Sequence, residues 1–131
     1  MIRVLLPIHT VSEANMRGHW TVRARRAKDQ RRAAALLVGA SVSGRTMSEP
    51  VSVVTLTRVY GSTRGLLNRA ARKLDDDNLR CALKAVRDGA ADALGINDGD
   101  ERIAWRYRQE QDDDTWLGAW RRGPLCVVEI E

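Results

Sequence analysis

The feature that most constrains the fold is a long stretch, residues 21–40, that has no proline and has glycine only at Gly39. Arg, Ala, Leu and Gln, which favour helices, make up most of this stretch, so it predicts one long helix. Its N-terminal half is basic, whereas Ala33, Leu36 and Leu37 begin an apolar side. We therefore expect a long helix that is basic at its start and has an apolar side further along.

Four other segments are rich in β-branched and aliphatic residues and predict strands. They are residues 2–8, 51–60, 103–109 and 125–130. A second helix is expected over residues 75–94, because carboxylates crowd its start, as a helix N-terminus favours, and Gly95 follows as a stop. The sequence has no repeats and no linker, so these elements predict a single compact α/β (α+β) domain over residues 1–131 with two main helices.

The chain carries an excess of arginine. Lys and Arg total 22 against 17 for Asp and Glu, a formal net charge of +5, and the only lysines are Lys28, Lys73 and Lys84. Arginine forks match the geometry of phosphate oxygens, so the composition favours a nucleic-acid partner. A GC-rich genome, which favours Arg codons for unrelated reasons, accounts for the same excess, and composition alone leaves both explanations open.

The cysteines and the hydropathy bear on the cellular compartment. Cys81 and Cys126 lie far apart, follow no zinc-ligand spacing and are not preceded by a signal peptide, so we expect reduced thiols. No apolar run approaches the roughly 20 residues of a membrane-spanning helix. The expectation is a soluble, cytoplasmic protein without a membrane partner.

Aspartates are concentrated in one part of this basic chain, because seven of the eleven lie between Asp75 and Asp100. Asp75, Asp76 and Asp77 place three like charges at the start of the second helix, and the helix dipole offsets only part of their repulsion. A divalent cation would neutralise the rest, and hard carboxylate oxygens suit Mg²⁺ or Mn²⁺. The alternative is that one aspartate caps the helix and the others are solvated.

The predicted second helix has two faces. Its core side is expected to comprise Leu79, Leu83, Val86, Ala90, Ala93 and Leu94. The opposite side carries Asp77, Cys81, Lys84, Asp88 and Asp92. This side is either solvated, with a Lys84–Asp88 pair one turn apart, or it lines a cleft in which the ammonium of Lys84 reaches a scissile phosphate. A second carboxylate group, Asp98 and Asp100, follows the helix, and the pattern leaves its distance from Asp75 open.

The order of these motifs resembles the signature of the RusA family of Holliday-junction resolvases. The matching features are Asp75-x-Asp77-Asn78-Leu79, a lysine downstream on the same helix, and Asp98-Gly-Asp100-x-x-Ile103 at the entry to a strand. Glu13-Ala14-Asn15, His19-Trp20 and the arginine-rich helix are similar to phage and prophage members of that family. The resemblance covers most of the chain.

The resemblance implies a RusA-like fold with a mixed β-sheet, and a homodimeric nuclease of a bacterial or phage-infected cell. Such a nuclease uses Mg²⁺, or Mn²⁺ in its place, and no organic cofactor, to resolve four-way junctions or other branched DNA by paired phosphodiester cuts. By position, Asp75 and Asp77 match the family's first two metal-binding aspartates. Asp100 matches the third, with Asp98 as the alternative.

One position departs from the family pattern. The family's essential lysine stands four residues after the second aspartate, where this chain has Cys81. We assign the role of that lysine to Lys84, which lies one turn further along the same face. A second function is therefore left open, that of a non-catalytic branched-DNA-binding protein that keeps the fold.

DNA would be held by side chains outside the acidic cluster. The candidates are Asn15, Arg23, Arg26, Lys28, Arg31, Arg32, Arg69 and Arg72. Any one of these arginines is equally compatible with a solvated surface. His19 and Trp20, in the loop before the long helix, are expected to pack as structural anchors.

Overall fold

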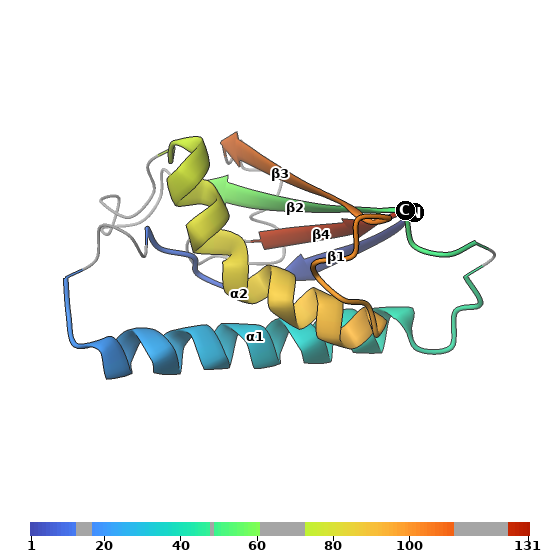
Figure 1. Ribbon diagram of the computed structural model, residues 1–131, viewed down its shortest axis with the longest axis horizontal. Coiled ribbons are helices and arrows are strands. Elements are labelled where there is room, and N and C mark those ends of the chain that lie inside the picture. The colour runs from blue at the N-terminus through green and yellow to red at the C-terminus, as the bar shows by residue number, and fades with distance from the viewer. Residues whose placement is uncertain (13–16, 48, 61–72, 112–125) are drawn as a thin grey trace.

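The computed structural model describes residues 1–12, 17–47, 49–60, 73–111 and 126–131. In chain order its elements are β1 (Ile2–Leu6), α1 (Trp20–Val42), β2 (Val53–Tyr60), α2 (Asp76–Leu94), β3 (Ala104–Gln111) and β4 (Cys126–Ile130) (Figure 1). They form a small α+β domain with a mixed sheet and two helices, which confirms the predicted fold class. Within the described ranges, neither helix combines the length and the hydropathy needed to cross a bilayer.

The strands form one four-stranded sheet in the order β1-β4-β2-β3. β4 pairs antiparallel with both β1 and β2, whereas β2 and β3 are parallel, with Val53 opposite Ala104 and Tyr60 opposite Gln111. A parallel pair needs a crossover connection, and α2 lies within it. α2 therefore runs back along the sheet from the end where β2 finishes to the end where β3 starts (Figure 1).

Both helices cover the same face of the sheet (Figure 1). Alternate strand residues, among them Val4, Leu56 and Val128, form the core with Leu83 of α2 and Val38 of α1. The predicted core side of α2 is confirmed, since the side chains of the first four predicted residues are buried and the last two are partly buried. These residues are Leu79, Leu83, Val86 and Ala90, followed by Ala93 and Leu94.

α1 packs through a different side from the one that the sequence predicts. Its buried residues are Gln30, Ala34 and Val38. Leu36 is 67% exposed and Leu37 is 37% exposed, so the prediction that these leucines begin the apolar side is wrong, although Ala33 does pack partly against the core. The physical reason is the close approach of α2 at Gly89, which brings a small residue of α1, Ala34, to the contact.

Candidate functional site

The acidic start of α2 is organised by Asp75. This residue is the N-cap of the helix, and its Oδ1 accepts a hydrogen bond from the backbone N–H of Asn78 at 2.9 Å. Its Oδ2 accepts a second bond from Nδ2 of Asn78, also at 2.9 Å, and Ser12 donates to Oδ1 of Asn78 at 3.3 Å. Asp76 and Asp77 occupy the first turn and are exposed. The capping interpretation is therefore confirmed for Asp75, whose orientation is set by two bonds.

A partly buried polar cluster, missing from the sequence prediction, anchors the residue before Asp75. Gln109 of β3 accepts from the backbone N–H of Leu74 at 2.8 Å and donates to the carbonyl oxygen of Leu74 at 2.7 Å. Arg58, which is 1% exposed and lies opposite Gln109 in the parallel pair, donates to the same Gln109 oxygen at 3.4 Å and to Thr10 at 3.2 Å. Arg58, Gln109 and Leu74 thus tie the start of α2 to the ends of β2 and β3.

The electrostatics of this cluster follow from burial. Desolvation lowers the pKa of the Arg58 guanidinium, although nearby Cys126 and Tyr60 act in the opposite direction. Burial also lowers the pKa of His9, and the positive charge of Arg58 adds to that shift. A charged group inside a strand is costly to bury unless it is hydrogen-bonded, and an arginine among valines and threonines was the signal in the sequence that could have revealed the cluster.

The second carboxylate group follows the other end of α2. The helix ends at Gly95, which has a left-handed φ of 64°, and the chain then turns through Asp98 and Asp100 into β3. Both carboxylate oxygens of Asp100 bind Arg102, with Nη2 at 2.7 Å from Oδ2. These side-chain bonds, with a further bond from the Arg102 backbone, lower the pKa of Asp100 to about 2. Asp98 is exposed, and its backbone carbonyl oxygen accepts from Arg87.

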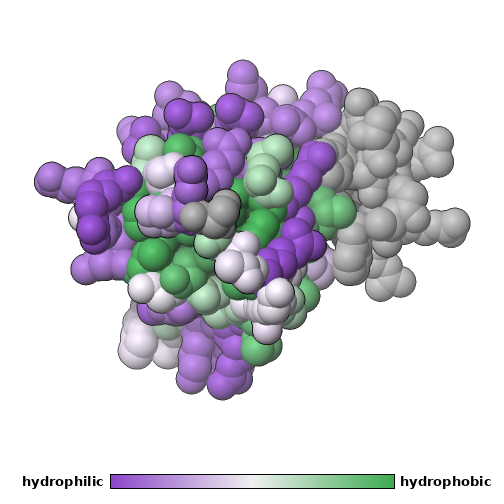
Figure 2. All heavy atoms as spheres, turned by 90° about the vertical axis from the view of Figure 1, so that its right-hand side faces the viewer, coloured by the Kyte–Doolittle hydropathy of each residue, from purple (hydrophilic) through white to green (hydrophobic). Residues whose placement is uncertain are grey.

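The surroundings of Asp100 are partly apolar. Asp100 and Arg102 line a hollow together with Val51, Leu94 and Ile103. Figure 2, which views the end of the molecule where β2 and β3 begin, shows hydrophobic residues in the middle of this end and hydrophilic residues around them. Asp100 therefore sits beside a partly apolar hollow, in which Glu49 is the other carboxylate among the described lining residues.

The two carboxylate groups lie at opposite ends of α2. The helix has 19 residues and a rise of about 1.5 Å per residue, so its ends are roughly 28 Å apart. The two ends of β3 lie near the two separate carboxylate groups. Gln109, near the end of β3, binds the backbone of Leu74 next to Asp75, whereas Ala104, at the start of β3, comes shortly after Asp100. One chain consequently does not bring Asp75 and Asp77 together with Asp98 or Asp100. In the parts of the chain that the structure describes, no group of three or more His, Cys, Asp or Glu could hold a metal ion.

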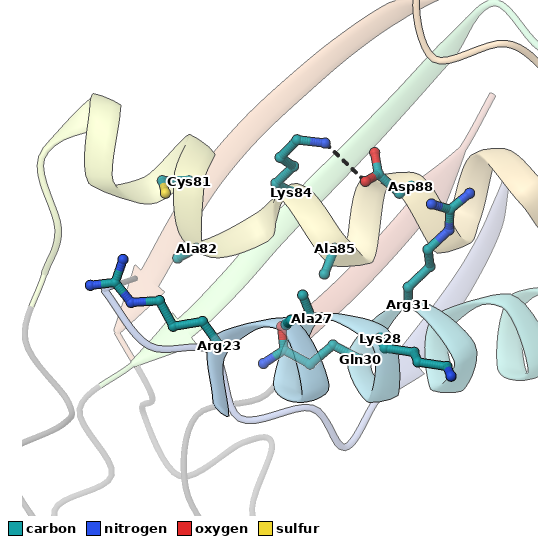
Figure 3. A pocket seen from close by; sticks show the side chains of 11 residues that line it. Arg23, Ala27, Lys28, Gln30, Arg31, Cys81, Ala82, Lys84, Ala85 and Asp88 are labelled. Atoms are coloured by element: carbon teal, nitrogen blue, oxygen red, sulfur yellow. Dashed lines mark hydrogen bonds and ion pairs between the residues drawn. The ribbon is translucent and has the colours of Figure 1, made fainter. Parts of the chain in front are cut away.

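Lys84 and Cys81 lie at the rim of the groove between α1 and α2, and the side chain of Lys84 extends away from α1 (Figure 3). Nζ of Lys84 forms an ion pair with Oδ2 of Asp88 at 2.9 Å, which confirms the pair expected on a solvated face. Asp88 lies one turn further from Asp77 than Lys84 does, and Figure 3 shows the lysine side chain extended toward it. Cys81, in the position of the family's lysine, is exposed, and neither cysteine forms a disulfide. The ammonium of Lys84 is thus directed away from the acidic start of α2.

The basic residues predicted to contact DNA fall into separate groups. Arg23, Lys28 and Arg31 line a groove between α1 and α2, whereas Arg26 and Arg32 do not. Arg31 is held by Asp92 through two bonds of 2.7 and 2.9 Å. The remaining candidates, Asn15, Arg69 and Arg72, lie outside the described residues.

The two aromatic residues at the start of the long helix, His19 and Trp20, do not pack in the core. His19 is the N-cap of α1, and its Nδ1 accepts from the backbone N–H of Thr21 at 3.3 Å. Trp20 is the first residue of the helix and is 71% exposed. The prediction that His19 and Trp20 are packed anchors is wrong, because both side chains are exposed at the N-terminal end of α1, where their ring centroids lie 5.7 Å apart.

Comparison of the chain with protein-family models, with curated proteins and with solved structures finds no match.

Proposed function

We propose that this protein is a Mg²⁺-dependent, structure-selective endodeoxyribonuclease that resolves Holliday junctions or other branched DNA by paired phosphodiester hydrolysis, as the RusA resemblance implies. The observation that carries the proposal is the anchoring of Asp75. An exposed acidic turn is held by Asn78 on one side and, behind Leu74, by the partly buried Gln109, which accepts a hydrogen bond from the buried Arg58. Burying polar groups costs stability unless they are paired with one another. The use of such groups to hold one exposed turn therefore supports a function at this turn.

The residues at this turn suit a hard divalent cation. Mg²⁺ typically takes one or two protein carboxylates together with water and substrate phosphate, and Asp75 and Asp77 supply two. Each oxygen of Asp75 accepts one hydrogen bond from Asn78, and a carboxylate oxygen has a second lone pair for a cation. A bound Mg²⁺ or Mn²⁺ would activate water and offset charge on the phosphate during hydrolysis. Asp75 and Asp77 would hold the ion, and Asn78 would keep Asp75 oriented.

The third carboxylate, Asp100 or Asp98, would come from a second copy of the chain. Within one chain it is separated from Asp75 by the length of α2, so it cannot share an ion with Asp75 and Asp77. When two copies are related by a two-fold axis perpendicular to α2, their α2 helices run in opposite directions. The end of one α2 helix then lies on the same side as the start of the other. A homodimer would thereby complete two sites at once, as paired incisions require.

Lys84 is proposed to stabilise the negative charge that develops on the phosphate or on the leaving oxygen. To do so it must leave Asp88, and its side chain is 71% exposed. A surface ion pair of this kind contributes only about 0–1 kcal/mol, so a DNA phosphate can compete for the ammonium. The protein would act in the cytoplasm of a bacterial or phage-infected cell, without an organic cofactor.

A second candidate function is binding of branched DNA without cleavage. The observation that favours it is Cys81 in the position of the family's lysine, combined with the Lys84–Asp88 pair that directs the nearest ammonium away from Asp77. Such a protein would keep the basic surface and the fold, and it would bind a junction without cutting it.

Cleavage of a synthetic four-way junction and of a matched linear duplex in Mg²⁺ tests the proposal. The wild type should nick the junction in preference to the duplex, and Asp77→Asn should abolish nicking without abolishing binding. Asp76→Asn is the matched control, because Asp76 is an exposed neighbour in the same helical turn and has no assigned role in metal binding. A wild type that binds the junction but never nicks it in Mg²⁺ or Mn²⁺ would leave the binding protein as the function.

A further inference from the structure

The groove between α1 and α2 is wedge-shaped. The two helices are in contact at Gly89 and Ala34, and Gly39 lies near Ala93 further along. The two helices diverge toward their N-terminal ends (Figure 1), and side chains of both line a groove of about 510 Å³ (Figure 3). The groove is therefore narrow where the helices converge and opens toward the end at which α2 begins with Asp76 and Asp77.

The floor of this groove consists mainly of small apolar side chains, with the buried Gln30 beside them. Ala24 and Ala27 of α1 face Ala82 and Ala85 of α2, and Figure 3 shows three of these alanines between the two helices. Such a floor has no large apolar side chain to anchor a protein segment, and the amide nitrogen of Gln30 already donates to the carbonyl oxygen of His9 at 3.0 Å. The floor suits a ligand that needs space and shape rather than specific contacts, such as a sugar chain.

The charged residues that line the groove are mostly basic. At the narrow end, Arg31 is paired with Asp92 and Lys84 with Asp88, so positive and negative charges balance. Arg23 lines the wide end and Lys28 lies further along α1, close to Arg31 (Figure 3), whereas Asp88 is the one carboxylate among the described residues that line the groove. Lys28 is exposed and forms no ion pair with any residue that the structure describes. The lining as a whole thus carries more positive than negative charge, and Arg23 is its basic residue nearest the acidic start of α2.

From this arrangement we infer that the groove holds one strand of DNA, with phosphates against Arg23 and Lys28 and sugars on the alanine floor, next to the site of cleavage. The inference rests on the proposed function, because that function makes DNA the polyanion. A groove between two packed helices has room for one backbone but not for a duplex. This geometry also separates the basic residues that were predicted to bind DNA. Arg23 and Lys28 would contact the strand, whereas Arg32 does not line the groove. Binding here is independent of base sequence.

Anisotropy of a fluorescein-labelled oligothymidine and of a labelled four-way junction, both in EDTA, tests the groove without any cleavage. Ala27→Phe fills the floor and leaves the charge unchanged, so it should weaken binding of both probes several-fold. Lys28→Gln should weaken binding and lower the slope of log K against log salt by about one. The matched controls are Ala40→Phe and Arg25→Gln, which make the same chemical changes on exposed positions of α1 outside the groove.

The two proposals fail in different ways. If Ala27→Phe and Lys28→Gln bind both probes as tightly as the two controls do, the groove is not a strand site, whatever the wild type does in Mg²⁺. If these variants lose affinity while the wild type never nicks a junction in Mg²⁺ or Mn²⁺, the groove stands and the nuclease proposal fails. Ala27 is exposed, so Ala27→Phe should fold. If Ala27→Phe does not fold, the affinity of Lys28→Gln relative to its control decides whether the groove binds a strand.

Discussion

Gly89 of α2 lies so close to α1 that a Cβ atom placed on it would stand 2.3 Å from the carbonyl oxygen of Arg31 and 2.7 Å from Cβ of Ala34. The nearest obstacle is backbone, which cannot rotate out of the way. This contact holds the narrow end of the groove closed, and it determines which side of α1 packs against the domain.

Gly89→Ala should therefore lower the free energy of unfolding by about 1–3 kcal/mol, the usual cost of overpacking, even though alanine is the better helix former. Urea denaturation would measure the change. Gly39→Ala is the control, because a Cβ there would lie 3.9 Å from Cβ of Ala93, an ordinary contact, and the variant should gain up to about 1 kcal/mol. Equal effects of the two substitutions would contradict the close approach.

Asp75 combines a structural and a proposed functional role that two substitutions can separate. Asparagine caps a helix about as well as aspartate does, so Asp75→Asn should keep the stability of the protein and lose Mg²⁺-dependent nicking. Asp75→Ala should lose nicking and also about 1 kcal/mol of stability, because the N–H of Asn78 loses its acceptor. Thermal denaturation and the junction assay, run on both variants, would show the difference. Full nicking by Asp75→Asn would remove Asp75 from the metal site.

Local signals predicted α2 well, because its limits depend on neighbouring residues. Asp75 caps the start, and Gly95 adopts the left-handed conformation at the end, as the sequence indicates. The packing side of α1 was predicted wrongly at Leu36 and Leu37, because it depends on a distant residue, Gly89. The side through which α1 packs depends on α1 and α2 together, so the sequence of α1 alone does not predict it.

The candidate site shows the same division between local and distant information. The capping role of Asp75 and the Lys84–Asp88 pair are one-turn relationships, and both were available from spacing. The pairing of Arg58 with Gln109 depends on the parallel register of β2 and β3, which a local pattern does not specify. The distance between Asp75 and Asp100 was left open by the sequence, and it is the structure that places these two residues at opposite ends of α2.

Gln109 is proposed to position the acidic turn through Leu74. Gln109→Ala removes both bonds to the Leu74 backbone, so it should cost about 1–3 kcal/mol of stability for the groups left unpaired. It should also raise the Mg²⁺ concentration needed for half-maximal nicking, which a purely structural loss would leave unchanged. Gln111→Ala, at the exposed end of the same strand, is the control. An unchanged Mg²⁺ requirement in Gln109→Ala would show that the anchor serves stability alone.

The Asp100–Arg102 pair makes a pH-dependent contribution to stability. The pKa of Asp100 is lowered from 3.8 to about 2, so the stabilisation is present above pH 3.8 and is lost as the pH falls through about 2. Arg102→Gln should therefore be less stable than the wild type above pH 4, and the difference should shrink toward pH 2. NMR titration of the Asp100 carboxyl group would check the cause. The pKa should rise toward its ordinary value in Arg102→Gln and stay low in Arg106→Gln, whose arginine is exposed on β3.

A metal site shared between two copies makes a prediction that a site within one chain does not. Asp75→Asn and Asp100→Asn should each be inactive as homodimers. After the two are unfolded together and refolded, a mixed dimer contains one site in which both substitutions meet and one site in which Asp75 and Asp100 are both intact.

The mixture should therefore regain nicking of one strand of a four-way junction without regaining paired incision of two strands. Product analysis on denaturing gels would distinguish the single nick from the paired cut, and sedimentation would verify that mixed dimers form. A mixture of Asp75→Asn with Asp77→Asn is the control and should stay inactive, because those two aspartates belong to the same turn of the same chain and every site in the mixed dimer lacks one of them. If mixed dimers of Asp75→Asn and Asp100→Asn form and remain inactive, Asp100 does not complete the site of its partner.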